Sequence, residues 1–272
     1  MRIAILADIH GNLAALEAAL AEVERLSPDL VLVAGDVVNG APDSAACWER
    51  VKALGCPTLR GNHERYVFDF GTERAAPEWS TPQFGPVQVS VADLSPAQRD
   101  ELAALPPTWR DSQAPDLVIV HASLRSDRDS VLPYTPDKLL ESMFASQDLP
   151  NLIVRAHNHQ CAVRHWNGRR IVTAGSVGLP LDGNPAAQFT VLERRAADWD
   201  VRHLAVPYDV EWTLRRFRET DYVDRAGPVG RLLLREVATA GHHLVPFLRF
   251  YERTRPDGLT LERAVHRFLE SI

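Results

Sequence analysis

The stretch RIAILADIHGN, residues 2–12, sets out the pattern that organises this chain of 272 residues. Residues 2–7 form an apolar run typical of a strand that is buried on both faces. The run ends in three polar residues, Asp8, His10 and Asn12. Apolar residues then recur at helical spacing over residues 13–26, and Asn12 is a candidate N-cap for that helix. The stretch therefore predicts a βα unit with polar side chains at the carboxyl end of its strand.

The same pattern recurs further along the chain. Further apolar runs end in polar residues at 30–36, 56–63, 116–121 and 151–159. Residues 71–95 are interrupted by prolines and glycines and are predicted to be a loop. Asn167-Gly168 lies between two β-rich runs, which indicates a tight hairpin. We expect an α/β fold in which strand ends bring polar side chains to one edge.

The chain changes character after Pro207, where helical patterns follow one another to the end. We expect a main domain over residues 1–208 and a helical C-terminal extension over residues 209–272. The extension carries apolar side chains that need a surface to cover, Trp212, Phe217 and Phe247 among them. Two roles fit: a cap on the main domain or the surface of a homodimer. Packing against the sheet of the same chain would need no dimer.

Composition narrows the location and the partners. The formal charge of −6 argues against a nucleic-acid binder with a broad basic face. Three widely spaced cysteines, Cys47, Cys56 and Cys161, do not form a disulfide framework and indicate a reducing compartment. The first apolar run stops at Asp8, too early for a signal peptide or a membrane span. We expect a cytoplasmic protein without a membrane partner.

The polar residues at the strand ends have to be considered as a set. Its members are Asp8, His10, Asp36, Asn62, His63, His121, His157 and His159. The carboxyl ends of strands in an open α/β sheet converge on one crevice. Carboxylates, an amide and imidazoles gathered there suit two divalent ions that share one carboxylate, an arrangement that hydrolyses phosphoesters by attack of hydroxide. Mixed nitrogen and oxygen ligands favour manganese, iron, zinc or cobalt over magnesium, and we expect manganese to support activity.

Five sequence blocks in order resemble the calcineurin-like metallophosphoesterase superfamily over residues 2 to about 206. They are DIH, the GD of GDVVNGAP (35–42), the GNHE of LRGNHE (59–64), the histidine of VIVHAS (118–123) and AHNH (156–159). The resemblance implies a four-layer α/β/β/α sandwich of two mixed sheets flanked by helices. It also implies two ligand sets, Asp8, His10, Asp36 and His159 for one ion and Asp36, Asn62, His121 and His157 for the other. Asp36 is then the bridge, and the resemblance makes His63 the general acid.

Three further residues are candidates to contact the substrate or to support the ligands: Asn12, Arg60 and Glu64. Glu64 either orients His63 through a hydrogen bond or is a solvated surface acid. Asn12 either reaches the phosphate or only caps its helix. The turn formed by residues 175–178 resembles the small-residue turn that packs under the metals in bacterial members, and an ordinary turn explains its glycines equally well.

Two departures from the family pattern bear on the substrate. LRGNHE is the wording of the Ser/Thr protein phosphatase branch, but GDVVNGAP lacks the arginine of that branch's GDxVxRG block. Arg60 or Arg125 could replace this phosphate-binding guanidinium. Ala156 stands where the last block usually has glycine, so its backbone is expected to avoid positive φ.

Residues 172–193 and 206–213 look like the bacterial phosphodiesterase-like members of the superfamily. The leading hypothesis is therefore a dimetal-dependent phosphoesterase that acts on a small phosphodiester or nucleotide. Two alternatives stay open: a Ser/Thr-protein-phosphatase-like or Ap4A-type phosphatase, and a metal-binding regulatory protein without catalysis.

Overall fold

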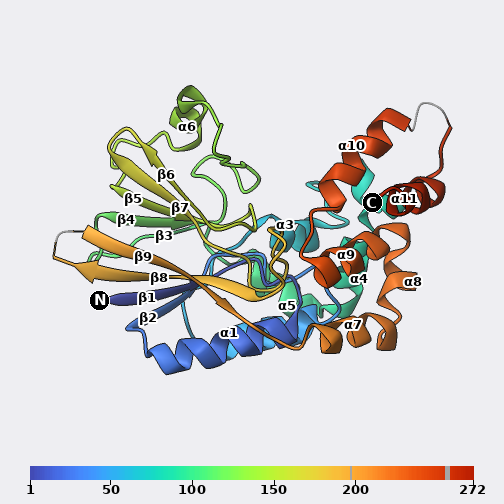
Figure 1. Cartoon of the computed structure of the whole chain (residues 1–272), viewed down its shortest axis with the longest axis horizontal. Coiled ribbons are helices and arrows are strands. Elements are labelled where there is room, and N and C mark those ends of the chain that lie inside the picture. Colours follow the sequence, from blue (N-terminus) through green and yellow to red (C-terminus); the bar gives the residue numbers. More distant parts are fainter. Residues whose placement is uncertain (197, 255–257) are drawn as a thin grey trace.

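The computed structural model describes residues 1–196, 198–254 and 258–272, and its centre is a pair of mixed sheets packed face to face (Figure 1). The first sheet has the strand order β2-β1-β8-β9 and the second β3-β4-β5-β7-β6. Strands of the first sheet are β1 (Arg2–Leu6), β2 (Leu30–Val33), β8 (Ala187–Arg195) and β9 (Asp198–Val206). Strands of the second are β3 (Thr108–Trp109), β4 (Leu117–Val120), β5 (Leu152–Arg155), β6 (Ala162–Trp166) and β7 (Arg169–Thr173).

Parallel pairing gives both sheets a common functional edge. β1 runs parallel to β2 in the first sheet, with Leu6 opposite Val33 at the carboxyl ends. β4 runs parallel to β5 in the second sheet. The remaining neighbours of these strands include antiparallel partners, β8 beside β1 and β3 beside β4, so both sheets are mixed. The predicted Asn167-Gly168 hairpin is confirmed as the turn between β6 and β7.

Helices cover the outer faces of the sandwich. Those of the main domain are α1 (Leu13–Leu26), α2 (Ser44–Ala53), α3 (Asn62–Asp69), α4 (Gly85–Asp93), α5 (Pro96–Ala103) and α6 (Asp137–Met143), with two short 3₁₀ turns, η1 (Pro77–Ser80) and η2 (Pro82–Phe84). The helical tail consists of α7 (Val210–Glu219), α8 (Tyr222–Ala226), α9 (Pro228–Thr239), α10 (Leu244–Thr254) and α11 (Leu261–Glu270).

Alternation along β1 shows how the layers are held. Ile3 and Ile5 are fully buried between the two sheets, where they join Ile119 and Val154 of the second sheet. Ala4 and Leu6 point to the opposite face and pack with apolar residues of α1 and α2. The outer face of the second sheet packs in the same way against α6, through residues such as Leu140. Successive side chains of a strand alternate between faces, so one apolar strand supplies two cores. The predicted four-layer α/β/β/α fold is confirmed.

Two local expectations were wrong. Residues 85–93 were predicted within a loop but form α4. Pro86 is tolerated because it lies in the first turn of the helix, where its missing N–H needs no partner. Val89 stabilises the helix by packing on the tail. The apolar run that begins at Cys56, expected to form a strand like the other runs, contributes only an isolated bridge between Thr58 and Val33. The chain therefore reaches the LRGNHE block from the edge of the first sheet without adding a strand to it.

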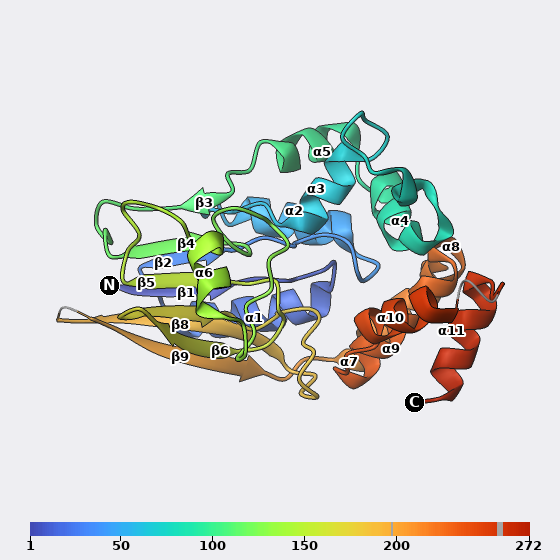
Figure 2. The same cartoon turned by 90° about the horizontal axis from the view of Figure 1, so that it is seen from above.

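The helical tail packs on the carboxyl-end edge of the sandwich (Figures 1 and 2). Phe217 and Tyr222 are buried against Ala41 in the loop after β2 and Leu179 in the loop after β7. Arg216 forms an ion pair with Asp43 at 2.8 Å, which ties α7 to the same loop after β2. Phe217 and Phe247 thus find apolar partners within their own chain.

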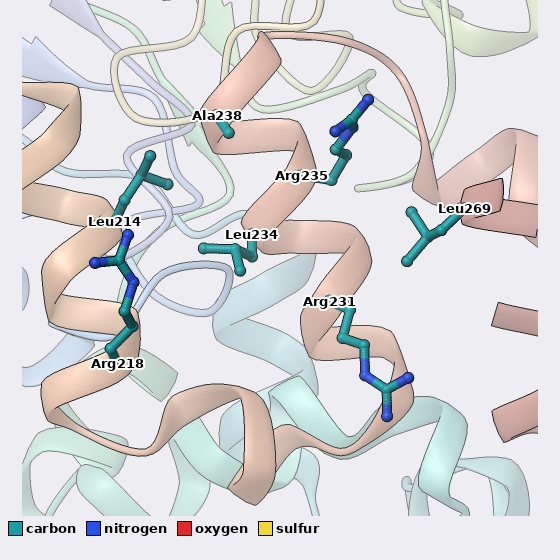
Figure 3. Close-up of a pocket in the computed structure, with 7 residues that line it drawn as sticks. All are labelled: Leu214, Arg218, Arg231, Leu234, Arg235, Ala238 and Leu269. Atoms are coloured by element: carbon teal, nitrogen blue, oxygen red, sulfur yellow. The ribbon is translucent and has the colours of Figure 1, made fainter. Parts of the chain in front are cut away.

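A groove of about 420 Å³ lies between α7, α9 and α11 of the helical tail (Figure 3). Its lining residues are Leu214, Arg218, Arg231, Leu234, Arg235, Ala238 and Leu269. None of these residues belongs to the polar set at the strand ends. Among the residues that the structure describes, no helix is both long and apolar enough to cross a membrane.

Candidate metal centre

The polar residues predicted at separate strand ends come together in two adjoining groups. Asp8, His10, Asp36 and His159 form one group, and Asp36, His121 and His157 form the other. Within each group the candidate ligand atoms lie within 4.8 Å of one another. Asn62 joins the second group, since its Oδ1 lies 3.1 Å from Nε2 of His121. We call these seven residues, Asp8, His10, Asp36, Asn62, His121, His157 and His159, the strand-end cluster; Asp36 is common to both groups.

Each group draws side chains from both sheets. Asp8 and His10 follow β1, and Asp36 follows β2, so these three belong to the first sheet. His121 follows β4, and the histidines of AHNH follow β5 in the second sheet. The cluster is therefore assembled across the interface of the sandwich, at the carboxyl ends of four strands.

Left-handed backbone turns aim the ligands inward. Asp8, His10, Asp36, His157 and His159 all have positive φ, between 52° and 70°. Residues other than glycine rarely adopt this region, and such strain concentrates at functional sites. Ala156 is not among the positive-φ residues, as expected from its identity. The left-handed turns of the AHNH block fall instead on its two histidines.

His10 and His159 face each other with bare ring nitrogens. Nδ1 of His10 lies 2.6 Å from the carbonyl oxygen of Asn39, and Nδ1 of His159 lies 2.6 Å from that of Leu179. A carbonyl only accepts, so both Nδ1 atoms carry a proton, and in a neutral ring Nε2 is then the unprotonated atom. Those two Nε2 atoms are only 3.0 Å apart. Two lone pairs at this distance repel unless a cation lies between or beside them. Histidines that bind metals are commonly oriented by such bonds from the other ring nitrogen.

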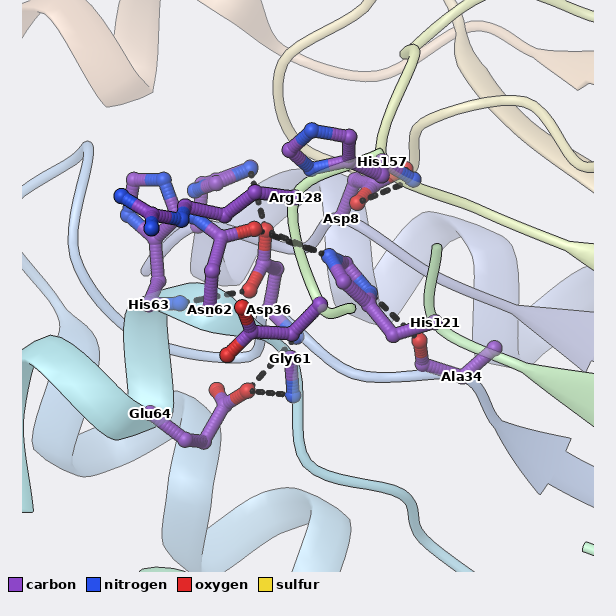
Figure 4. A network of polar contacts seen from close by, with 12 residues as sticks. Asp8, Ala34, Asp36, Gly61, Asn62, His63, Glu64, His121, Arg128 and His157 are labelled. Atoms are coloured by element: carbon purple, nitrogen blue, oxygen red, sulfur yellow. Dashed lines mark hydrogen bonds and ion pairs between the residues drawn. The ribbon is translucent and has the colours of Figure 1, made fainter. Parts of the chain in front are cut away.

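His121 repeats this arrangement in the second group. Its Nδ1 lies 2.8 Å from the carbonyl oxygen of Ala34, and its Nε2 lies 3.2 Å from Oδ2 of Asp36 (Figure 4). Burial alone would lower the pKa of His121, but Asp36 raises that pKa to about 9. A positive charge beside Nε2 of His121, carried by a proton or a metal ion, is therefore stabilised by the carboxylate of Asp36.

Asp36 has the geometry of a bridging ligand. Its Oδ1 accepts a hydrogen bond from the backbone N–H of His63 at 2.9 Å. Its Oδ2 is buried without a hydrogen-bond partner among the described residues, and lies 3.8 Å from Nε2 of His10. Burial alone would raise the pKa of Asp36, but the facing imidazoles, His121 first, hold it well below its usual range. This ionised oxygen faces imidazole nitrogens of both groups, Nε2 of His121 at 3.2 Å and Nε2 of His10 at 3.8 Å.

Burial shifts the other members of the cluster towards their neutral forms. It raises the pKa of Asp8, whose carboxylate accepts the backbone N–H of His157 at 3.1 Å. It lowers the pKa of His10 and of His157 well below the ordinary histidine value. Neutral imidazoles are the form that binds metal ions.

His63 lies beside the cluster, and its hydrogen bond places the proton of the neutral ring on the opposite nitrogen from that of His10. Its Nδ1 accepts a hydrogen bond from the side-chain amide of Asn39 at 2.7 Å, so the neutral ring carries its proton on Nε2. The ring packs edge-on against that of His10, with centroids 4.6 Å apart. Burial lowers the pKa of His63. Asn39 was missed as a site residue from the sequence, although its place directly after the GD block was a usable signal.

Glu64 corrects both sequence interpretations of this residue. It is fully buried, so it is not a surface acid. Its carboxylate accepts backbone N–H groups of Asp36, Val37 and Gly61 at 2.7–2.8 Å, rather than orienting His63 (Figure 4). Burial, with the charge of Asp36 in addition, raises the pKa of Glu64 to about 7. The side chain fastens the loop after β2 to the start of α3.

Asn12 and Arg60 also have defined places. Asn12 caps α1 by accepting the backbone N–H of Ala15, and its amide group donates to the carbonyl oxygen of Gly178 at 2.8 Å. Its side chain is thus fully engaged within the protein, as expected for a cap and not for a phosphate ligand. Arg60 donates its backbone N–H to Pro106, and no contact between its side chain and the cluster is present among the described residues.

The turn formed by residues 175–178 packs against β1 at the cluster. Ser176 Oγ donates to the carbonyl oxygen of Asp8 at 2.7 Å. A Cβ on Gly178 would lie 1.8 Å from the carbonyl oxygen of Ile9, and one on Gly61 would lie 2.1 Å from Oδ1 of Asp36. Small residues are required at both positions because the backbone runs directly beneath the ligands.

Comparison with known proteins agrees with this geometry. The family model described as calcineurin-like phosphoesterase matches residues 1–161, which include every member of the strand-end cluster. The chain belongs to this family. Its members are phosphoesterase hydrolases, and the present member carries a cluster suited to metal binding.

Relatives with solved structures share the fold over most of their length. A metallophosphoesterase from Sphaerobacter thermophilus is 24% identical, with a TM-score of 0.67 over 88% of this chain and 99% of that chain. The hypothetical protein PH1004 from Pyrococcus horikoshii is 20% identical, with a TM-score of 0.69 over 83% and 95%. In sequence, the uncharacterized protein MJ0912 from Methanocaldococcus jannaschii is 22% identical, over 77% of this chain and 88% of its own.

Proposed function

We propose that this protein is a dimetal-dependent phosphoesterase that hydrolyses a phosphodiester or a small nucleotide-type substrate. The observation that carries the proposal is the 3.0 Å approach of Nε2 of His10 and Nε2 of His159, while both Nδ1 atoms face carbonyl oxygens. Burial keeps the pKa of His10 well below its usual value, so the ring of His10 is neutral. Its Nε2 can then bind a metal ion together with Nε2 of His159.

The donor set fits two divalent ions. Asp8, His10, Asp36 and His159 would hold one, and Asp36, Asn62, His121 and His157 would hold the other. Both sets mix imidazole nitrogen with carboxylate or amide oxygen, as manganese, iron, zinc and cobalt accept. When bound, such a pair would neutralise charge on the phosphoryl group and lower the pKa of a bound water towards neutrality.

The protein's own residues supply orientation and a proton. The hydrogen bond between Asn39 and Nδ1 fixes the ring of His63, so that in the protonated ring Nε2 is the atom expected to give its proton to the leaving oxygen. Asp36 stays ionised throughout the neutral range because its pKa is well below the usual value. Glu64 holds the two loops that carry Asp36 and His63 in fixed relation.

Two features support a small substrate over a phosphoprotein. The GDVVNGAP block lacks the arginine that the protein phosphatase branch uses. Helices of the tail pack against the same loop, through Ala41 and Asp43, and so restrict the space beside the cluster. We propose that the tail is a cap over residues 1–208. A monomeric molar mass measured by light scattering would exclude the alternative role as a dimer surface.

Metal analysis and a substrate panel test the proposal. The purified protein should contain or take up about two equivalents of a divalent ion. With manganese it should hydrolyse bis-p-nitrophenyl phosphate, and chelation should abolish that activity. Asp8→Ala and His121→Ala should lose both metal and activity, while His165→Ala, at an exposed histidine of β6, serves as the matched control. Activity that persists in Asp8→Ala protein would refute the proposal.

The same panel separates the alternatives. Cyclic nucleotides, Ap4A, a phosphopeptide and p-nitrophenyl phosphate are compared at equal concentration. Faster hydrolysis of the phosphopeptide than of any diester would favour the protein phosphatase hypothesis instead.

Three free cysteines, Cys47, Cys56 and Cys161, support our further proposal of a reducing, cytoplasmic location.

A further inference from the structure

The GD loop supplies no cation for substrate phosphate, and the sequence offers Arg60 and Arg125 as replacements. Arg125 is already engaged: its guanidinium donates to both carboxylate oxygens of Asp129, at 2.8 and 3.1 Å, and to Ser142 at 2.7 Å. Arg65, on α3, is held in the same way by Asp127. Neither guanidinium is available for an anion without breaking an existing ion pair.

Arg128 lies in the same loop but in a different position. In the view of Figure 4 its side chain extends across Asn62 and His63 of the strand-end cluster and its surroundings. Burial raises the pKa of Tyr66, whose ring is 5.5 Å from that of His63, and the nearby charge of Arg128 opposes that rise. Arg128 is exposed, and no carboxylate lies within ion-pair distance of it in the described part of the chain.

The loop around Arg128 is anchored on both sides. Asp127 pairs with Arg65 of α3, and the carbonyl oxygen of Asp129 accepts from the fully buried Arg155 at 2.7 Å. The backbone N–H of Arg128 itself donates to Ser126 Oγ at 3.1 Å. Because its neighbours are fixed, little ordering is needed to hold Arg128 beside the cluster.

Tyr66 adds a second restraint. Its ring packs edge-on against Trp79, with centroids 5.0 Å apart, and the guanidinium of Arg65 lies 5.0 Å over its face. A tyrosine held on two sides presents its hydroxyl at a fixed point. The charge of Arg128 lies near that hydroxyl, and the five N–H donors of its guanidinium can serve oxygen acceptors.

We propose that Arg128 binds the non-bridging oxygens of the substrate's phosphoryl group, in place of the arginine that the GD loop lacks. This inference rests on the proposed phosphoesterase function and names the residue that recognises its substrate's anionic part. A planar guanidinium can donate two parallel hydrogen bonds to a phosphoryl group, which fixes orientation as well as adding charge. Placed beside His63, Arg128 would hold the phosphoryl group next to the residue that protonates the leaving oxygen.

Arg128→Ala is the decisive variant, and Arg125→Ala is its control from the same loop. Loss of a charge-assisted contact predicts a decrease in kcat/KM of about 10- to 100-fold in Arg128→Ala, mostly as increased KM. The decrease should be greater for p-nitrophenyl phosphate, a dianion, than for bis-p-nitrophenyl phosphate, a monoanion. Arg128→Lys should recover part of the loss, because it restores the charge without the fork. Arg125→Ala should stay within about threefold of the parent protein.

A binding measurement separates this inference from the function itself. Inorganic phosphate is titrated into manganese-loaded protein by calorimetry, with no turnover required. The parent and Arg125→Ala should bind phosphate, and Arg128→Ala should bind it about 10-fold or more weakly at unchanged metal content. Equal phosphate affinity in Arg128→Ala, or no phosphate binding by the parent, would overturn the assignment of Arg128. Loss of metal binding and of all hydrolysis by the parent would instead refute the proposed function.

Discussion

The strand-end cluster and the helical tail lie at the same end of the molecule, yet they bury opposite kinds of side chains. The cluster buries carboxylates and imidazoles on left-handed backbone, with one carboxylate oxygen left without a partner among the described residues. The tail buries phenylalanines, leucines and valines on regular helices. Buried polar groups and strained backbone cost stability unless a ligand compensates them, whereas apolar packing adds stability directly. The cluster is therefore expected to serve a ligand, and the tail to hold the structure around it.

The largest expected effect is a loss of activity when a residue of the strand-end cluster is replaced, with little loss of stability. Asp36→Asn should lower kcat/KM by about 1,000-fold, because loss of the bridging charge removes several kcal/mol of transition-state stabilisation. In excess chelator its melting temperature should stay within about 3 °C of the parent, since the metal-free cluster contributes little stability. Differential scanning calorimetry with and without manganese, beside steady-state kinetics, checks both parts. A large loss of stability in chelator would place Asp36 among the structural residues.

The tail should give the reverse result. Phe217→Ala removes a fully buried ring that packs edge-on against Tyr222 with centroids 5.0 Å apart. Truncation of a buried phenylalanine costs about 3–5 kcal/mol, so the midpoint of urea unfolding should fall clearly. Phe217→Leu, which keeps most of the volume, should lose less. A loss under about 1 kcal/mol for the alanine variant would mean that the tail can repack or detach.

A smaller effect tests the residue between the cluster and His63. Asn39 has a φ of 66°, so Asn39→Gly removes the amide without straining the backbone. The carbonyl that binds Nδ1 of His10 is retained, while the hydrogen bond to Nδ1 of His63 is lost. We expect kcat/KM to fall about 10-fold at unchanged metal content, the usual range for a residue that orients a functional group. An unchanged rate would show that His63 needs no orientation by Asn39.

The smallest effect concerns a buried acid in the tail. Burial raises the pKa of Glu236 above its ordinary value of 4.5, even though it accepts the backbone N–H groups of His243 and Leu244. The folded protein therefore holds this proton more tightly than the unfolded chain does, so stability decreases as pH rises above about 4.5. Glu236→Gln lacks this titration.

The stability of Glu236→Gln relative to the parent should therefore increase as pH rises above about 4.5, and level off once Glu236 is ionised in the folded protein. Urea titrations at several pH values measure the difference. A gap that is constant with pH would show that Glu236 is ionised in the folded protein with an ordinary pKa.

Much of the fold and of the metal centre could be predicted because both depend on local pattern. The apolar run of β1 and the polar residues Asp8 and His10 after it are adjacent in the sequence. What was missed depends on contacts between distant segments. Glu64 binds the N–H of Val37 across 27 positions, and Arg128 reaches Tyr66 from another loop. No periodicity or spacing encodes such pairs, which appear only when the sheets have brought the loops together.

The location of α4 was missed for the same reason. Residues 85–93 have a weak local helix pattern, and their order comes from Val89 packing on Phe217 and Tyr222 of the tail. Tertiary burial here overrides the local signals of glycine and proline. The tail was correctly expected to be helical, but what it covers could not be inferred from its own residues.

The origin of the ligands in both sheets has a mechanical consequence. Each candidate ion would be held by side chains of the first sheet and of the second, so it would act as a cross-link between the two halves of the sandwich. Between the carboxyl ends of the strands, separation of the sheets would then require breaking coordinate bonds as well as exposing apolar surface. Metal binding by the cluster would hold the two sheets together at the end where the substrate binds. The same ions would then take part in the reaction and prevent local separation of the sheets.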